Sequence, residues 1–182
     1  RDVTRESTFQ GEHTFKVYKG IKIWNNFIYY FWNFFFISIF WCYFHMFLSP
    51  SIEIGEMWPP KNLEIFNPFM IPLLNTILLL SSGVSITMCH YSILMNFKFK
   101  SLLSLFFTII LGLIFTLFQY LEYNEAKFSI SDSVFGSIFF MATGFHGMHV
   151  LVGTCFLMIN LFRIFFNNYS MIHHFGFEAA AW

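Results

Sequence analysis

The sequence predicts an all-α membrane protein, a polytopic helix bundle with four complete transmembrane spans and the start of a fifth. Of the 182 residues, 57% are hydrophobic and only 11% are charged, a composition typical of membrane proteins. Four apolar stretches are long enough to cross a bilayer, which takes about 20 helical residues. No alternation of apolar and polar residues competes with this pattern, so a β-barrel is not expected.

The predicted elements follow one another along the chain. Residues 1–23 carry several charges and form a segment on the inner side of the membrane, whereas residues 24–182 form the transmembrane helical domain. The apolar runs predict spans at about 24–48, 69–95, 102–121 and 134–162, and the start of a further helix at about 174–182. The second span begins beside Pro72, which a helix tolerates near its start.

The charges between the spans orient them. On the side of the amino-terminal segment lie eight basic residues: Arg1, Arg5, Lys16, Lys19, Lys22, Lys98, Lys100 and Arg163. The opposite side carries only Lys61 and Lys127. Because Lys and Arg collect on the inner side of a membrane, the amino terminus is predicted to face the bacterial cytoplasm or its organellar equivalent, the matrix.

Two histidines, His146 and His149, lie three residues apart within the fourth span, in "FMATGFHGMHVLVGTCF". This spacing puts both on one helix face, so the pair either binds a haem or a metal or packs against a neighbouring helix. A closed metal site needs about four ligands and the pair supplies two, which favours packing. Gly144 and Gly147 add a small-residue edge that would let another helix approach closely.

Ionisable side chains outside the spans gather on the inner side, at the depth of lipid phosphates. They are Arg1, Arg5, His13, Arg163, His173 and His174. Arginine can hold a phosphate with two hydrogen bonds, so binding of an anionic lipid is one interpretation and simple orientation charge is the other. The formal net charge of zero, without a basic cluster, argues against nucleic acid as a partner.

Other functional classes remain open from the residues alone. Small polar residues in "LLSSGVSIT" would suit substrate contact in an independent multi-pass transporter, although helix contact is their more common use. A membrane cytochrome with haem on the span histidines is a second alternative. The spans contain almost no formal charge, which argues against a relay of ions or protons. The three cysteines stand far apart in apolar runs and predict neither a disulfide nor a metal site.

Several long motifs resemble one family in the same order along the chain. They are "RDVTREST.QG.H", "WPP", "NP...PLLNT.LL.SGVSIT..H", "ISD...GS.FF.ATGFHG.HV..GT.FL" and "HHFGFEAAAW". Together they closely resemble subunit III of mitochondrial and bacterial cytochrome c oxidase, from Arg1 to Trp182. The resemblance implies a seven-helix protein whose first two helices lean away from the other five and leave a V-shaped cleft filled with phospholipid.

The resemblance also implies a function within a complex of the mitochondrial inner membrane. Such a subunit carries no haem, copper or other redox centre, because these belong to subunits I and II. It braces subunit I, holds structural phospholipids of the cardiolipin, phosphatidylethanolamine or phosphatidylglycerol type, and supports proton uptake and turnover stability. Expected partners are therefore subunit I, other subunits of complex IV and membrane lipids.

Matched positions carry expectations for single residues. His13 and Trp41 would border the cleft lipid, and Arg5 would lie near the same headgroups. Arg163, with His173 or His174, would contact an anionic lipid. The matching histidines of the family are not redox ligands, so the resemblance strengthens the packing interpretation of the pair in the fourth span.

Two departures from the family pattern stand out. The family has a membrane-embedded glutamate nine residues before the tryptophan of "FFW", and here Trp32 occupies that position, which puts any role of the carboxylate in doubt. Two family helices should also precede Arg1, and the last helix should continue beyond Trp182. We therefore expect either a fragment or a split subunit whose missing helices arrive as separate chains.

Overall fold

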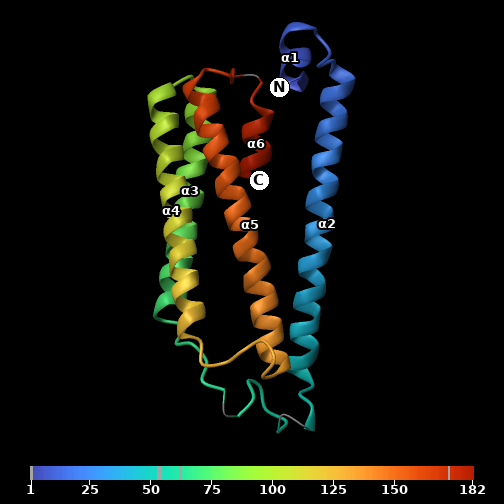
Figure 1. The fold of residues 1–182 in the computed structure, drawn as a ribbon, viewed down its shortest axis with the longest axis vertical. Helices are drawn as coiled ribbons and strands as arrows, with labels where there is room; N and C mark the ends of the chain where they lie inside the picture. Colours follow the sequence, from blue (N-terminus) through green and yellow to red (C-terminus); the bar gives the residue numbers. More distant parts are fainter. Residues whose placement is uncertain (1, 53–54, 62, 172) are drawn as a thin grey trace. The chain divides into compact units, whose positions relative to one another are not determined.

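The computed structural model describes residues 2–52, 55–61, 63–171 and 173–182, so Arg1 lies outside the described residues. The regular secondary structure of these residues consists of α-helices and a short helical turn, without a strand. The helices are α1 (Asp2–Phe9), α2 (Phe15–Leu48), α3 (Ile71–Leu94), α4 (Lys98–Glu125), α5 (Val134–Phe165) and α6 (Phe175–Ala181) (Figure 1). Four of them, α2 to α5, are long and apolar enough to cross a membrane, which confirms the predicted fold class.

Helix ends agree with the predicted spans where charge does not interrupt the apolar run. α2 starts at Phe15, nine residues before the predicted span, and α4 also extends past its predicted span at both ends. The extra turns contain Lys16, Lys19 and Lys98. Lysine is a good helix former whose stem can cover apolar surface, so charge ends the apolar run without ending the helix.

Two asparagines end long helices by the same mechanism. Asn96 and Asn167 adopt φ values of 60° and 59° directly after α3 and α5. The backbone N–H of Phe97 donates to the carbonyl of Ser92 (2.9 Å), and that of Asn168 donates to the carbonyl of Arg163 (2.9 Å). These are Schellman caps, in which a left-handed residue, here Asn in place of the usual Gly, lets the last carbonyls find donors.

The chain divides into two compact units, residues 1–45 and 46–182, and each is described by itself. The predicted boundary, at 23/24, is a different one. It marks where the chain enters the membrane, whereas the boundary at 45/46 separates two groups of residues that contact one another. The first unit contains α1, which is too short and polar to show in the hydropathy pattern, and most of α2. No described residue of α2 is buried.

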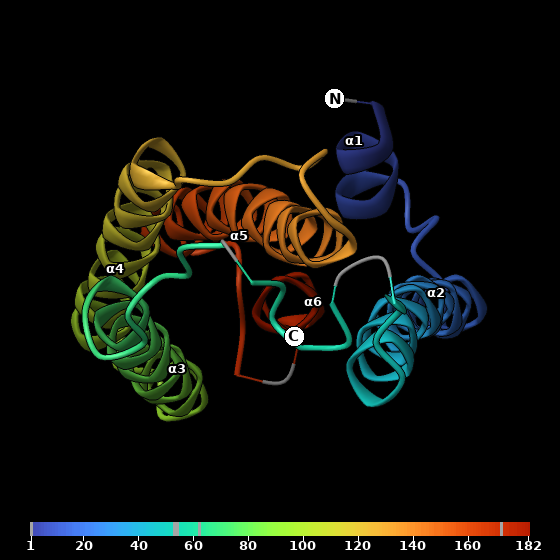
Figure 2. The same ribbon diagram turned by 90° about the horizontal axis from the view of Figure 1, so that it is seen from below.

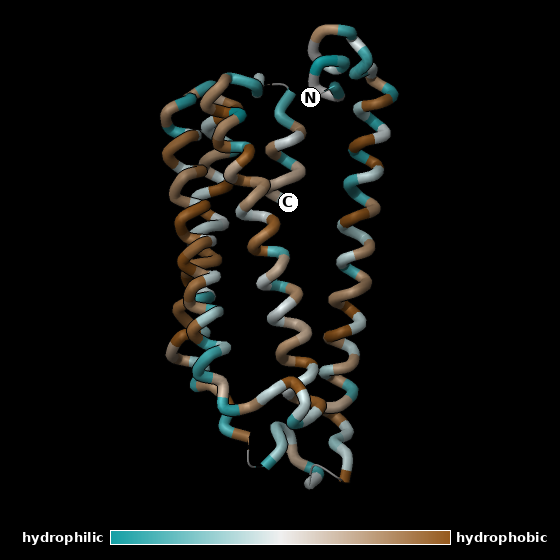
Figure 3. The backbone as a smooth tube through the Cα atoms, viewed as in Figure 1, coloured by the Kyte–Doolittle hydropathy of each residue, from teal (hydrophilic) through white to brown (hydrophobic). Residues whose placement is uncertain are grey.

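The second unit is built around α4, which packs against both α3 and α5 (Figures 1 and 2). The short α6 packs against α5. We call the end of this unit that holds Asn96 and Asn167 the inner end, following the predicted orientation, and the end that holds the α4–α5 loop the outer end. The buried core lies toward the inner end and consists of Cys89, Ile93, Leu105, Ile109, Leu157, Ile164 and Phe177. Apolar residues otherwise cover the outside of these helices (Figure 3).

Small polar residues form the contact between α3 and α4. The hydroxyls of Ser85 and Thr108 lie 2.8 Å apart across the two helices. The thiol of Cys89 donates to the carbonyl of Ser101 (3.3 Å). Thr108 also donates to the carbonyl of Ser104 in its own helix (2.8 Å), so its hydroxyl is satisfied on both sides. In a membrane such small residues let helices approach closely and leave no polar group without a partner.

Gly112 of α4 lies tightly against α5. A Cβ atom at this position would lie 2.6 Å from Cγ2 of Thr154. Thr154 is a β-branched residue in a helix, and its hydroxyl donates to the carbonyl of Leu151 (2.8 Å), so its methyl group has little freedom to move away. Gly147, in contrast, has no atom within 4 Å of such a Cβ.

We therefore expect Gly112→Ala to destabilise the protein and Gly147→Ala not to do so. Both substitutions gain the same helix propensity, but only the first overpacks a helix contact, at a cost of about 1–3 kcal/mol. Unfolding in mixed detergent measures the free energy of each variant. Equal effects at the two positions would show that the α4–α5 contact is not set by Gly112.

Candidate functional site

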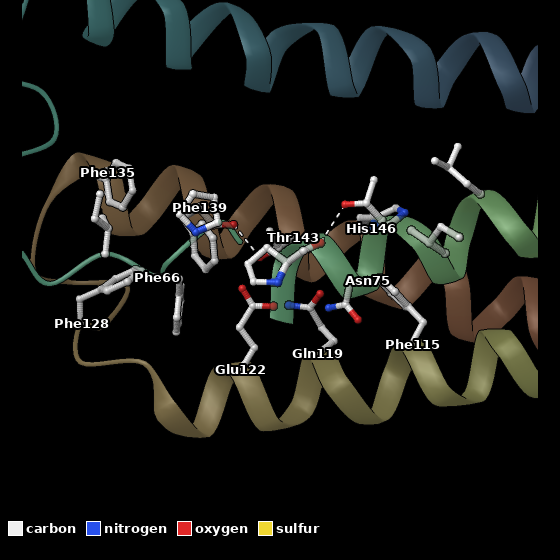
Figure 4. A pocket seen from close by; sticks show the side chains of 16 residues that line it. Phe66, Asn75, Phe115, Gln119, Glu122, Phe128, Phe135, Phe139, Thr143 and His146 are labelled. Atoms are coloured by element: carbon white, nitrogen blue, oxygen red, sulfur yellow. Dashed lines mark hydrogen bonds between the residues drawn. The ribbon is translucent and has the colours of Figure 1, made fainter. Parts of the chain in front are cut away.

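An apolar pocket of about 670 Å³ opens at the outer end of the second unit. Its walls come from the start of α3, the end of α4, the start of α5, the α2–α3 connection and the α4–α5 loop (Figure 4). Polar lining residues are Asn75, Thr76, Gln119, Glu122, Thr143 and His146. A mostly apolar cavity with a few convergent polar groups is the usual form of a site for an amphipathic or apolar ligand.

Asn75, Gln119 and Glu122 lie in a row along one side of the pocket (Figure 4). Asn75 and Glu122 are each 6% exposed. Within the described part of the chain, the side-chain oxygen of Asn75 has no hydrogen-bond partner. A buried amide oxygen without a partner is costly, so a donor from a ligand, a water or another chain would stabilise this wall.

Phenylalanine rings close the loop end of the pocket. Phe128 is buried, and its ring centroid lies 5.6 Å from that of Phe66, 5.8 Å from Phe135 and 5.4 Å from Phe139. Edge-to-face and tilted arrangements at these distances stabilise aromatic clusters beyond their buried area. Sequence reasoning missed this cluster because phenylalanine is abundant throughout the chain and its loop positions did not stand out.

The loop before α5 is held by Asp132 and Ser133. The Asp132 carboxylate accepts hydrogen bonds from the backbone N–H (2.6 Å) and the hydroxyl (2.7 Å) of Ser129, and these bonds lower the pKa of Asp132. Ser133 caps α5 by accepting from the N–H of Gly136 (3.2 Å). An ion pair between Lys127 and Glu64 joins this loop to the α2–α3 connection. The rim of the pocket is thus held by hydrogen bonds within the α4–α5 loop and by an ion pair between this loop and the α2–α3 connection.

The two histidines of the fourth span have different surroundings. His146 lines the pocket, and its ring forms a T-shaped pair with that of Phe115 at a centroid distance of 5.6 Å. Nδ1 of His149 donates to the carbonyl of Phe145 in its own helix (2.5 Å). A Cβ on Gly144 would contact the Tyr123 hydroxyl at 3.9 Å, which is ordinary packing distance. The packing interpretation of this pair and of Gly147 stays a prediction, and Gly112 has a tighter contact with a neighbouring helix than Gly144 or Gly147.

At the inner end, Arg163 is held from one side by an aromatic ring. Its guanidinium carbon lies 4.5 Å from the centroid of Tyr169, whose hydroxyl donates to the buried side-chain oxygen of Asn160. Burial raises the pKa of Tyr169, and the charge of Arg163 offsets part of this effect, so the phenol remains a donor at neutral pH. No carboxylate of the described residues lies within ion-pair distance of Arg163.

The adjacent residues His173 and His174 lie in different environments. His173 is exposed, whereas His174 is only 5% exposed. Nδ1 of His174 donates to the carbonyl of Ser170 (3.2 Å), and its Nε2 lies 3.2 Å from Nε2 of His90. Of the two, only His173 has an exposed side chain.

The remaining predicted lipid contacts belong to the first unit. Arg5 pairs with Asp2 at 3.6 Å, and the ring of His13 lies 6.2 Å from that of Tyr18. Trp41 is 76% exposed. Arg163, His173 and His174 belong to the second unit, whereas Arg5, His13 and Trp41 belong to the first. Trp32, in place of the family glutamate, contacts the ring of Phe35 at 5.6 Å.

Apolar helices of membrane length, with a largely apolar pocket between them, define a polytopic helical membrane protein. Comparison with known proteins is more specific. The family model described as cytochrome c oxidase subunit III matches residues 1–182. The chain belongs to this family.

Relatives agree with the family model. The chain is 55% identical to cytochrome c oxidase subunit 3 of Aedes aegypti and 53% identical to that of Drosophila melanogaster, over all of this chain and 70% of each relative. It is 50% identical to that of Chondrus crispus, over all of this chain and 67% of the relative.

The loop before α5 generates a pH-dependent prediction. Because hydrogen bonds from Ser129 lower the native pKa of Asp132, this residue stabilises the fold at pH above the unfolded value of about 3.9. The contribution is lost as the pH falls through the lower native pKa. Asp132→Asn should therefore lower the thermal midpoint at pH 7, and the difference from the parent protein should shrink as the solution is acidified.

Glu125→Gln provides the matched control, since Glu125 is an exposed carboxylate at the end of α4. It should show no comparable difference between neutral and acidic pH. A constant gap between Asp132→Asn and the parent at every pH would contradict the proposed role of the carboxylate charge.

Proposed function

We propose that this chain is a noncatalytic, lipid-holding subunit of a mitochondrial cytochrome c oxidase. Membership of the subunit III family places it in an oxidase assembly. In this proposal haem and copper reside in subunits I and II, and the present chain braces subunit I. The amino-terminal segment lies on the matrix side, in agreement with the excess of Lys and Arg on that side.

The observation that carries lipid binding is the geometry of Arg163. Tyr169 covers one face of its guanidinium, and no described carboxylate neutralises it. A positioned guanidinium loses little entropy on binding and can hold a phosphate oxygen pair with two parallel hydrogen bonds. Lys98, whose ammonium lies 5.5 Å from the Phe165 ring centroid, adds a second cation at this end.

Exposed apolar surface supports both lipid binding and attachment to another subunit. No described residue of α2 is buried within this chain, although its hydropathy is that of a membrane span. Lipid tails or apolar helices of other subunits must cover this surface. Arg5, His13 and Trp41 on the first unit are proposed to border such lipid, and His173 to assist Arg163.

The alternative of an independent transporter loses its sequence basis. It rested on the small polar stripe of α3, but Ser85 of that stripe bonds to Thr108 of α4. Family membership places the chain with oxidase subunits instead.

Purification in mild detergent tests the proposed function. The chain should co-purify with haem a and with subunit I, while the isolated polypeptide shows no Soret band. Depletion of the chain should leave electron transfer measurable but should shorten the time over which the oxidase keeps turning over. A chromophore on the isolated chain, or assembly apart from any oxygen-consuming complex, would exclude the proposal.

Lipid binding is tested by Arg163→Gln. We expect the purified complex to lose an anionic phospholipid, measured by mass spectrometry of extracted lipids, because the amide cannot neutralise a phosphate. Arg163→Lys should restore retention only partly, since lysine lacks the planar fork. Lys127→Gln, which removes the same charge at the outer end, should leave the lipid content unchanged. Equal lipid content in all variants would show that Arg163 serves orientation alone.

A further inference from the structure

We infer that His90, His174 and Glu178 form a binding site for a divalent transition-metal ion of the zinc class. The three residues come from the last part of α3, the position before α6 and the first turn of α6. Their ligand atoms all lie within 4.8 Å of one another. Among the described residues, these three side chains form the group of His, Cys, Asp or Glu that could hold a metal ion.

The distances fit a tetrahedral ion. Nε2 of His90 and Nε2 of His174 lie 3.2 Å apart, and Nε2 of His174 lies 3.4 Å from Oε1 of Glu178. Tetrahedral zinc with bonds of 2.0–2.1 Å separates its ligand atoms by about 3.3 Å. The third edge, from His90 to Glu178, is 4.0 Å and would have to shorten. Glu178 can make this movement because its side chain is 37% exposed.

A second layer of contacts fixes the two imidazoles. Nδ1 of His174 donates to the carbonyl of Ser170, which leaves Nε2 as the nitrogen with a lone pair in the neutral ring. The ring of His90 stacks on the fully buried Phe177 at a centroid distance of 5.9 Å and an interplanar angle of 17°. A hydrogen bond from the other ring nitrogen to a backbone carbonyl is the usual support of a metal-bound histidine.

The donor set selects the kind of ion. Two imidazoles and one carboxylate suit zinc and its neighbours, whereas magnesium and calcium require a shell of oxygen ligands. A cavity of about 320 Å³ is lined by two of the three side chains, His90 and Glu178, together with Ile86, Thr87 and Trp182. This cavity has room for a water molecule as the fourth ligand.

Without a metal ion, the three facing atoms, two ring nitrogens and a carboxylate oxygen, would need protons between them to form hydrogen bonds. His90 could donate to Nε2 of His174, but that nitrogen also faces the Glu178 carboxylate, which is an acceptor. A divalent cation satisfies all three lone pairs at once. Its consequence would be mechanical, because it would join the end of α3, which carries His90, to the start of α6, which carries Glu178.

Zinc analysis of the purified oxidase complex tests the inference. The complex is dialysed against Zn²⁺, and its zinc content is compared with that of complexes carrying His90→Gln or Glu178→Gln. Both variants should lose a zinc ion that the parent binds, or bind it at least about tenfold more weakly, as expected when a ligand or its support is removed. X-ray absorption of the parent complex, after subtraction of the spectrum of a variant, should show zinc with nitrogen and oxygen neighbours near 2.0 Å and an imidazole signature.

His173→Gln is the matched control, because it removes the neighbouring imidazole, which contributes no atom to the cluster. It should retain the zinc ion. Equal zinc content in the parent, His90→Gln and Glu178→Gln complexes would overturn the inference, as would loss of zinc from the His173→Gln control. Using Glu178→Gln beside His90→Gln separates loss of the ion from a folding defect, since glutamine preserves the shape of the side chain.

Discussion

Close approach of α4 to both of its neighbours is the constraint on which the second unit depends. In a bilayer the lipid tails are as apolar as leucine, so helices are held by packing and by hydrogen bonds between them. Thr108 bonds across to Ser85 of α3, and Gly112 admits the methyl group of Thr154 of α5. These contacts lie on one stripe of α4, near its middle, and they fix the distances between the three helices.

The two ends of the unit follow from this central contact. Toward the inner end the helices continue to pack, and Phe177 of α6 fills the core between them with no exposed surface. Toward the outer end the helices leave an apolar pocket, which the loops close with Phe66 and Phe128. The α3–α4 pair contributes Asn75, Gln119 and Glu122 to one wall of that pocket (Figure 4). The polar groups of the pocket are therefore placed by the same packing that closes the core.

Sequence reasoning reached the architecture and the family but only part of the site. Span positions follow from hydropathy alone, because bilayer thickness fixes the length of an apolar helix. The start of α2 and the short α1 could not be found in this way, since charged turns remain helical without adding hydropathy. Contacts such as those of Arg163 with Tyr169 and of Asn160 with Tyr169 need the path of the α5–α6 connection, which carries no periodic pattern. His90 and His174 are 84 residues apart, and nothing in their local sequence relates them.

Gly176 connects the two inner-end features. A Cβ atom at this position would lie 2.5 Å from Nη1 of Arg163 and 3.1 Å from the Tyr169 hydroxyl, so the guanidinium packs directly on the backbone of α6. The same first turn of α6 carries Glu178, and His174 precedes it. The lipid proposed to bind Arg163 and the metal ion proposed to bind His174 and Glu178 would thus both act on α6. This helix is only seven residues long and packs on α5, so these polar contacts would add to the burial of Phe177 in holding it in place.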